Sequence, residues 1–440
     1  MTASPGKASD QLLKRELGVF QSMMLGLGSI LGTGVFVSIG IAAGVAGHAV
    51  LPAIACAAIL AICNGISSAQ LASAHPVSGG TYEYGYRLLG SRLGFTAGWM
   101  FMFAKSASAA TAALGLAGYL AQLIGGNTLP SMLYSLTAVI ILACVALTGI
   151  KRASYVNSIV VSITLVSLLA FILGGFEHST PSFQLLWSDV TAGVTDTPTA
   201  FFEAIALIFV AYTGYGRIAT LGEEVRDPRR TIPKSILTTL FLAMFLYIFV
   251  AVAAISAVGS TSYATFARRQ VAPLIMIAEH FDNPTIVWTV TIGGITALIG
   301  VLLNLVLGLS RVLLAMGRRR DVPQIFGRVH ERSGVPGSAT MAVAVIISSL
   351  VIIGDVKLTW SFSAFSVLMY YALTNLCALR LTEENRMYPK WISVAGLLGC
   401  VFLTFWIDPQ VLVAGIGVIV VGNIWKSVIN RLHRRVTTTP

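Results

Sequence analysis

Charge is scarce in this chain: of its 440 residues, 11% are charged and 56% are hydrophobic. Soluble proteins carry roughly a quarter charged residues. A soluble fold of this composition would not have enough polar side chains to cover its surface, so that class is excluded. Lipid is the alternative solvent, and the chain supplies many runs of the roughly 20 apolar residues with which a helix crosses a bilayer.

Patterns of catalysis and metal binding are also lacking. No Ser/His/Asp, Cys/His or His/Glu constellation stands out, so we expect no enzyme site. No Gly-Lys-Ser/Thr phosphate loop is present, which argues against a transporter driven by its own ATPase. The cysteines lie scattered in apolar runs without metal-ligand spacing, at Cys56, Cys63, Cys144, Cys377 and Cys400. We therefore expect no cofactor.

Long apolar runs are what the chain has instead. Runs between charged or Pro/Gly-rich breaks predict about 12 transmembrane spans. They lie near residues 17–43, 48–74, 93–123, 129–149, 154–175, 200–220, 235–258, 285–315, 339–354, 360–380, 388–406 and 409–429.

The distribution of Lys and Arg predicts the orientation of these spans. One set of connections holds nearly all of the basic residues, whereas the opposite set holds only Arg268, Arg269 and Lys357. Basic loops face the cytoplasm, so we expect both termini there, in a multi-pass protein of the plasma (inner) membrane. The same rule explains the net charge of +11 without any binding of nucleic acid.

Two of the predicted spans are rich in glycine at their centres. The first contains Gly32-Thr33-Gly34, and the sixth contains Tyr212-Thr213-Gly214-Tyr215-Gly216. A glycine inside a helix costs about 1 kcal/mol relative to alanine. Close packing of helices through small residues is one explanation, and local unwinding is the other. The two sites occupy corresponding positions in two five-helix halves, which favours unwinding in an inverted-repeat transporter.

Unwound backbone in a membrane has a chemical use. Its N–H and C=O groups lose their intrahelical partners, and lipid cannot replace them, so they must line a cavity or bind a ligand. The N-terminus of a half-helix attracts a carboxylate, and freed carbonyls at a C-terminus attract an ammonium group. An α-amino acid carries both groups, so two broken helices that cross would suit it.

Four motifs then carry a resemblance to a known family. The chain resembles the amino acid–polyamine–organocation superfamily of permeases, in its amino acid permease branch, over nearly its whole length. The matching segments are Gly32-Thr33-Gly34-Val35-Phe36, the Pro-x-Ser-Gly-Gly-x-Tyr motif at 76–82, the Glu-Glu-x-x-Asp-Pro-x-Arg-x-Ile-Pro motif at 223–233, and Ser310-Arg311 with Asp321-Val-Pro323.

The resemblance implies an all-α membrane protein with the leucine-transporter type of fold and alternating access. Two inverted five-helix repeats would cover 17–176 (spans 1–5) and 199–382 (spans 6–10), followed by spans 11 and 12 in 388–429. Cytoplasmic tails would cover 1–16 and 430–440. Helices 1 and 6 would be discontinuous.

The resemblance also implies a substrate site at these breaks. Thr33 and Gly34 would meet the substrate carboxylate, and Ile30 and Gly32 would line the same pocket. The second break would supply carbonyls for the amino group and part of the gate, through Tyr212, Thr213 and Gly214, with Tyr215 as a further gating candidate.

The energy source stays open at this point. Some proton-coupled relatives carry a Lys in the fifth helix, where this chain has Ser167. A hydroxyl there could serve a sodium site, or the protein could be an uncoupled exchanger. Lys105, inside the third span, either snorkels to the interface or supplies the positive charge missing from the fifth helix. Ionisable groups at membrane depth suggest function by default.

Arg217 follows the second break. It either caps freed carbonyls or pairs with Glu223 or Glu224, or it contacts an anionic substrate. Arg311 we expect to snorkel or to pair locally.

The leading hypothesis is a secondary transporter of amino acids, as ion-coupled symporter or exchanger. Apart from Glu203, the predicted core spans are nearly free of carboxylates, which favours neutral amino acids over polyamines. A polyamine or organic-cation carrier of the same fold is the alternative, and a non-transporting membrane sensor or accessory subunit is another. The expected partners are a small amino acid, membrane lipid, and H⁺ or Na⁺.

Overall fold

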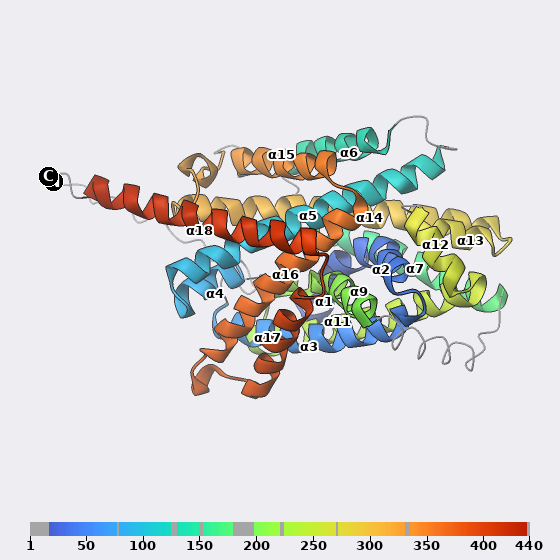
Figure 1. Cartoon of the computed structure of the whole chain (residues 1–440), viewed down its shortest axis with the longest axis horizontal. Coiled ribbons are helices and arrows are strands. Elements are labelled where there is room, and N and C mark those ends of the chain that lie inside the picture. The colour runs from blue at the N-terminus through green and yellow to red at the C-terminus, as the bar shows by residue number, and fades with distance from the viewer. Residues whose placement is uncertain are drawn as a thin grey trace.

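A computed structural model describes residues 17–76, 79–124, 130–148, 153–178, 198–220, 224–269, 272–330 and 335–437. Within these ranges the chain is a bundle of helices (Figure 1), and the only β-pairing is an isolated parallel bridge between Leu17 and Val225. Helices are the expected form, because an α-helix satisfies its backbone hydrogen bonds within one segment when lipid surrounds it.

Nine helical segments in the described residues are long and apolar enough to cross a membrane. They are Val19–Ala46 (α1, η1 and α2), Val50–Ala74 (α3), Ser91–Leu123 (α5), Tyr155–His178 (in α7, Ala153–His178), Pro198–Ala219 (α9, η3 and α10), Pro228–Val258 (α11), Pro284–Arg318 (α14), Val356–Leu379 (α16) and Pro409–Arg431 (in α18, Pro409–Thr437).

Three shorter apolar helices occupy the other positions at which spans were predicted: α6 (Ser131–Leu147), α15 (Gly337–Ile353) and α17 (Lys390–Thr404). The multi-span membrane class is thus confirmed, whereas the count of twelve stays a prediction. The remaining described elements are short: η2 (Gly47–Ala49), α4 (Thr81–Leu88), α12 (Ser260–Arg269), α13 (Pro273–Glu279), η4 (Gln324–Gly327) and η5 (Glu383–Asn385).

The start of α11 differs from its prediction. Hydropathy placed this span at 235–258, but the helix begins at Pro228, a residue favoured at the first helical position. Its first turns carry Arg229, Arg230 and Lys234. These charged residues lowered the apolar signal, although they form a helical extension of the same segment. Similarly, α18 continues to Thr437, inside the range that was predicted as a tail.

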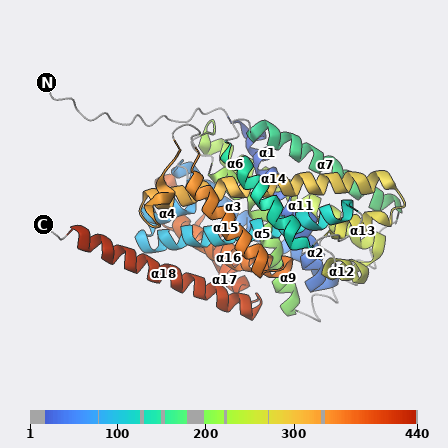
Figure 2. The same ribbon diagram turned by 90° about the horizontal axis from the view of Figure 1, so that it is seen from above.

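The broken helices lie inside the bundle. In the first segment α1 packs on α11 and α7, while α2 packs on α9. Helix α5 packs on both α14 and α16, and α6 lies beside α15 on one face. The last helix, α18, runs along the outside of the bundle (Figure 2), and only 17% of its apolar window is buried. The centre of the molecule therefore belongs to α1–α2 and α9–α10, and the outer helices hold them.

A buried ion pair fixes α18 to the loop after α14. Asp321 is 1% exposed, and the Lys426 ammonium contacts its Oδ1 atom. The Tyr82 and Tyr86 hydroxyls from α4 donate to Oδ2, at 2.7 and 2.5 Å. The Trp425 indole N–H donates to the Asp321 carbonyl at 2.9 Å. Every acceptor and charge of this aspartate is thus engaged, as a buried carboxylate requires.

Replacing Asp321 by Asn would leave the Lys426 ammonium buried without its counter-charge. Breaking one partner of a buried pair costs about 3–5 kcal/mol, so Asp321→Asn should markedly lower the melting temperature of the detergent-purified protein, followed by tryptophan fluorescence. The control is Arg230→Gln, in the exposed pair with Asp227 at 3.8 Å, where we expect a change below about 1 kcal/mol. Equal melting of Asp321→Asn and the parent protein would contradict the assignment.

Candidate functional site

The first break follows the end of α1. The α-helix runs over Val19–Ile30, a turn occupies Leu31 and Gly32, and a π-helix, η1, covers Gly34–Ser38 before α2 (Ile39–Ala46) continues. The Leu31 N–H still donates to the Leu27 carbonyl at 2.8 Å, and the helical series resumes where the Phe36 N–H donates to the Gly32 carbonyl at 3.2 Å. A π-bulge of this kind is frequent at functional sites.

The second break follows α9 (Pro198–Tyr212). A 3₁₀ turn, η3, covers Thr213–Tyr215, and one further helical turn, α10 (Gly216–Ala219), completes the segment. Only this one turn departs from α-helical geometry, and the chain on both sides of it remains helical. The Gly216 N–H donates to the Thr213 carbonyl, so helical hydrogen bonding continues through the turn in 3₁₀ form.

The two breaks touch one another, and tyrosine hydroxyls contact carbonyls at both of them. The Tyr247 hydroxyl of α11 lies within hydrogen-bond distance of the Ile30 carbonyl, at 2.9 Å, and of the Ala211 carbonyl, at 3.3 Å. The Tyr371 hydroxyl of α16 donates to the Thr213 carbonyl at 3.3 Å. One side chain of α11 therefore joins the end of α1 to the end of α9.

Glycine is required where the breaks meet. A Cβ at Gly34 would collide with the Tyr247 hydroxyl, and a Cβ at Gly214 would collide with the carbonyl of Ser29. Gly34 thus permits a close contact with a side chain, and Gly214 permits one with the backbone, that a Cβ would prevent.

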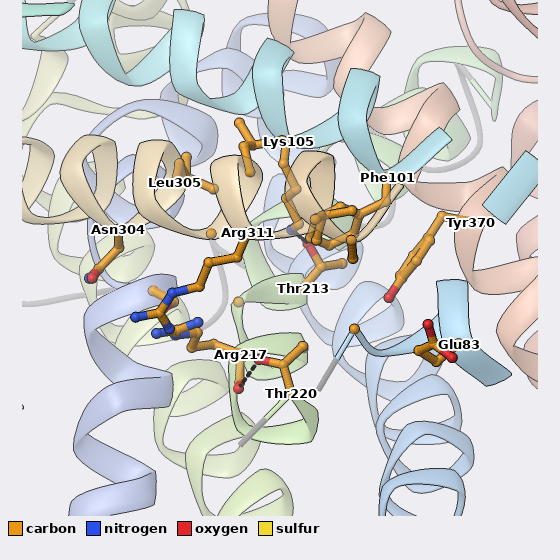
Figure 3. Close-up of a pocket in the computed structure, with 18 of the residues that line it drawn as sticks. Glu83, Phe101, Lys105, Thr213, Arg217, Thr220, Asn304, Leu305, Arg311 and Tyr370 are labelled. Atoms are coloured by element: carbon orange, nitrogen blue, oxygen red, sulfur yellow. Dashed lines mark hydrogen bonds between the residues drawn. The ribbon is translucent and has the colours of Figure 1, made fainter. Parts of the chain in front are cut away.

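A cavity of about 650 Å³ begins at this contact. Its inner end is formed by Ser29, Lys105, Thr213 and Gly214, and one wall is the C-terminal half of α14 (Figure 3). The full lining is Ser29, Gly79, Glu83, Phe101, Lys105, Thr213, Gly214, Gly216, Arg217, Thr220, Glu224, Val301, Asn304, Leu305, Gly308, Leu309, Arg311, Val312, Leu314, Ala315, Arg318, Arg319, Tyr370 and Tyr371.

The cavity extends to one side of the bundle only. It follows α14 from Val301 to Arg318, and its mouth carries the charged side chains of Glu83 and Arg319. Beyond the first break the interior is filled instead: the Phe36 and Tyr119 rings meet edge to face at 5.8 Å, and both are fully buried. Described residues therefore close one side of the two breaks and leave the other open.

Four of the sequence-predicted residues line this cavity: Lys105, Thr213, Gly214 and Arg217. The Lys105 ammonium donates to the Thr213 hydroxyl at 3.2 Å, and that hydroxyl donates in turn to the Val210 carbonyl at 2.7 Å. Lys105 therefore points to the second break, and not to the membrane interface as snorkelling would require.

The other predicted residues lie behind the cavity wall, packed in the core: Ile30, Gly32, Thr33, Gly34, Tyr212, Tyr215 and Ser167. The hydroxyls of Thr33 and Ser167 are buried, and no hydrogen-bond partner reaches them within the described structure. Tyr215 is buried beside Tyr371, with ring centroids 5.5 Å apart. Ser167 of α7 packs directly on Gly293 of α14. The structure thus brings the two breaks together but separates Ser167 from the cavity.

The structure corrects the expectation for Arg311 and one of the pairings expected for Arg217. Arg311 was expected to snorkel or to pair locally, but it faces the cavity, and no ion pair to it exists among the described residues. Arg217 likewise forms no ion pair with Glu224, while Glu223 lies outside the described residues.

Sequence reasoning missed much of the lining. Asn304 lies on the α14 wall and donates from its amide to Asn157 Oδ1 at 3.3 Å, and the Asn157 amide donates to the Met24 carbonyl at 2.9 Å. Phe101 and Tyr370 form an aromatic wall, with ring centroids 5.3 Å apart. An arginine and an asparagine seven residues apart in one apolar span, Arg311 and Asn304, were the available signal.

An ion pair lies at the mouth, and two tyrosines of α4 lie next to it. Arg319 holds both carboxylate oxygens of Glu83, at 2.7 and 2.6 Å, and its guanidinium stacks over the Tyr86 ring at 4.2 Å. Burial, followed by the hydrogen bond to Asp321, raises the pKa of the Tyr82 and Tyr86 hydroxyls above its ordinary value. Both groups therefore stay protonated and keep donating to Asp321.

Comparison with known proteins now decides the family. The profile of the family described as amino acid permease matches residues 21–434. The chain belongs to the amino acid permease family. Because this is a family of transporters, the predictions of a permease and of a non-enzyme are confirmed.

Relatives of this permease are similar along most of its length. An uncharacterized transporter of Mycobacterium tuberculosis is 36% identical over 429 residues, which cover 97% of this chain and 94% of that protein. The branched-chain amino acid permease BcaP of Bacillus subtilis is 27% identical over 426 residues, covering 90% and 89%. The vacuolar cationic amino acid transporter 2 of Arabidopsis thaliana is 27% identical over 397 residues, covering 85% and 61%.

The close contact between Gly34 and Tyr247 predicts how one added methyl group would change the stability of the protein. Gly34→Ala would push against the Tyr247 hydroxyl, and overpacking of this kind costs about 1–3 kcal/mol. The control, Gly417→Ala, has open space at the same position on α18 and should be neutral or stabilising by up to about 1 kcal/mol. Thermal unfolding in detergent provides the measurement.

A double variant separates this collision from a general loss of stability. In Gly34→Ala/Tyr247→Phe the obstructing hydroxyl is gone, so the two effects should not add. Strict additivity of the two single changes would show that the Tyr247 hydroxyl is not what excludes a side chain at Gly34.

Proposed function

We propose that this permease carries amino acids across the membrane by alternating access, with the substrate bound where the two breaks meet. The observation that supports the proposal is the one-sided cavity: it reaches the Thr213–Gly214 break from one face, while Phe36 and Tyr119 fill the opposite face. A site that is open to one side at a time is what alternating access needs.

The proposed topology has twelve spans and both termini in the cytoplasm of a cell bounded by the plasma (inner) membrane. Helices α6, α15 and α17 have 15–17 residues, about 23–26 Å of helix, which a locally thinned bilayer or flanking residues accommodate. Lys357 and Glu203 pair at 3.5 Å on the face predicted to be outside. The cavity mouth, with Arg318 and Arg319, would then open to the cytoplasm.

The proposed binding mode uses the atoms around the break. The hydroxyls of Ser29 and Thr213 and the Lys105 ammonium lie at the inner end of the cavity, where the α-carboxylate and α-amino groups of a substrate would need donors and acceptors. Thr33 and Gly34 would join the site when the inverted repeats change their arrangement. In that state the unpartnered Thr33 hydroxyl would acquire a partner.

The charges of the cavity bear on the choice of substrate. Basic side chains outnumber the carboxylates of Glu83 and Glu224 in its lining, which also holds Lys105, Arg217 and Arg311. A polyamine or another organic cation would be repelled, so this alternative is disfavoured. Relatives whose names state branched-chain or cationic amino acids support an amino acid substrate but do not decide its side chain.

The proposed coupling ion is the proton, and Lys105 would be the residue that couples it to transport. A positive charge that contacts the second break through Thr213 could take the place of the basic residue that Ser167 lacks, and proton coupling would follow from its titration. The alternative is a sodium ion near the buried Ser167 hydroxyl, for which neighbouring carbonyls would complete the ligands. Exchange without a coupled ion is the third possibility.

The first test of the proposal is one-sided access. In a variant without its native cysteines, Gly308→Cys would place a thiol in the cavity, where a side chain has open space. We expect a membrane-impermeant maleimide to label it from the cytoplasmic face and not from outside. Gly417→Cys on α18, outside the cavity, is the control and should stay unlabelled from both faces. Equal labelling of Gly308→Cys from outside would contradict the proposed state.

The second test concerns Lys105. In liposomes, Lys105→Ala should slow amino acid uptake at least tenfold and flatten its dependence on pH, because the ammonium that contacts the break is gone. A sodium requirement that appears in the parent protein and persists in the variant would assign coupling to the Ser167 region instead. Unchanged rate, pH profile and sodium response would rule out a role for Lys105.

A further inference from the structure

Arg217 and Arg311 bring two positive charges to one part of the cavity. They project from α10 and α14, and their guanidinium groups are turned toward one another (Figure 3). The charge of Arg311 opposes that of Arg217, while Glu224 attracts it. Among the described residues neither arginine has an ion pair. The pair therefore faces the cavity without a contacting counter-charge.

Three other cations of the described residues contact carboxylates. Arg319 Nη2 donates to both carboxylate oxygens of Glu83, Lys426 contacts Asp321, and Lys357 reaches Glu203 at 3.5 Å. The chain thus neutralises cations at the mouth, at the terminal helix and on the far face. Inside the cavity, Arg217 and Arg311 have no such partner among the described residues, and they face one another next to the breaks, which makes them candidates for contact with a ligand.

Electrostatics and geometry select the kind of ligand. Two like charges inside a bundle repel one another more strongly than in water, because the surroundings screen them less. An anion between them removes this repulsion. The planar guanidinium group matches a carboxylate through two parallel N–H···O bonds. Two such groups together therefore fit one carboxylate far better than a neutral or cationic group.

The distance from the break selects the size of the ligand. Arg217 comes three residues after Gly214, about 5 Å along a helix. An amino acid whose α-groups sit at Ser29 and Thr213 would extend its side chain along this distance toward the α14 wall. A side-chain carboxylate one or two methylenes from the α-carbon would then lie near the arginine pair.

We propose that Arg217 and Arg311 form the subsite for the side-chain carboxylate of an acidic α-amino acid, so that the transported substrate is anionic. This inference rests on the proposed function and names its substrate class. It replaces the expectation of a neutral substrate. The scarcity of carboxylates behind that expectation argues only against cations, and does not separate neutral from acidic side chains.

The test is a comparison of matched ligands on the purified full-length protein. L-glutamate and L-glutamine have the same shape and differ in charge, while glutarate lacks the amino group. Charge-assisted hydrogen bonds predict that L-glutamate or L-aspartate binds about 10- to 100-fold more tightly than L-glutamine. Ligand-induced shifts of the melting temperature and a titration give the dissociation constants. L-leucine and L-arginine complete the panel.

Single substitutions test whether the preference for L-glutamate over L-glutamine depends on the two arginines. Arg217→Gln and Arg311→Gln should each reduce the preference for L-glutamate over L-glutamine to below about threefold, because L-glutamate loses far more affinity than L-glutamine does. Arg318→Gln removes the same charge from the mouth of the cavity and should keep the preference. Loss of one repelling charge should leave the melting temperature of the ligand-free protein unchanged or raised. A purely structural arginine would lower it.

Three results would contradict the proposal that the two arginines bind the side-chain carboxylate of an acidic amino acid. Equal binding of L-glutamate and L-glutamine, or preference for L-leucine, would reject an acidic substrate while amino acid binding itself stands. Equal loss of preference in Arg318→Gln would show general attraction and no specific pair. Glutarate binding as tightly as L-glutamate would reject an amino acid as the ligand. If no amino acid shifts the melting temperature, the proposed function fails together with the subsite.

Discussion

A carbonyl oxygen released by a break in a membrane helix needs a donor from the protein, since lipid provides none. In this permease the Tyr247 hydroxyl lies within hydrogen-bond distance of the carbonyls of Ile30 and Ala211, at the ends of α1 and α9, and the Tyr371 hydroxyl donates to the carbonyl of Thr213. These contacts fix the crossing of the two broken segments. The cavity, the glycine requirements and the position of Lys105 all follow from where that crossing lies.

Some charged residues around the cavity pair with one another and join helices, whereas others face the cavity without a carboxylate partner. Arg319 neutralises Glu83 at the mouth, and Lys426 of the terminal helix neutralises Asp321, so these pairs hold α4, α14 and α18 in place. Deeper inside, Lys105 meets only a hydroxyl, and the arginines of α10 and α14 meet no carboxylate of the described chain. The electrostatic potential is therefore positive inside the cavity, where a substrate would bind, because the cations there are not neutralised. The cations that join helices are neutralised by carboxylates.

Hydropathy was enough to predict the segments of this fold, such as 48–74 for the helix Val50–Ala74, but not the start of α11, where charged residues continue the helix. Glycine density predicted where the breaks lie. It could not predict a π-helix and a 3₁₀ turn, because these depend on donors such as Tyr247 that are remote in sequence. The direction of Arg311 was missed because it depends on how α14 is rotated in the bundle.

The volume of the cavity has a consequence for hydration. A space of about 650 Å³ has room for on the order of twenty water molecules, several times what one amino acid displaces. A substrate entering from the mouth can therefore keep much of its water shell until it reaches the crossing. Dehydration would be completed only there, so the largest energetic barrier for a charged solute would lie at the two broken helices and not at the entrance.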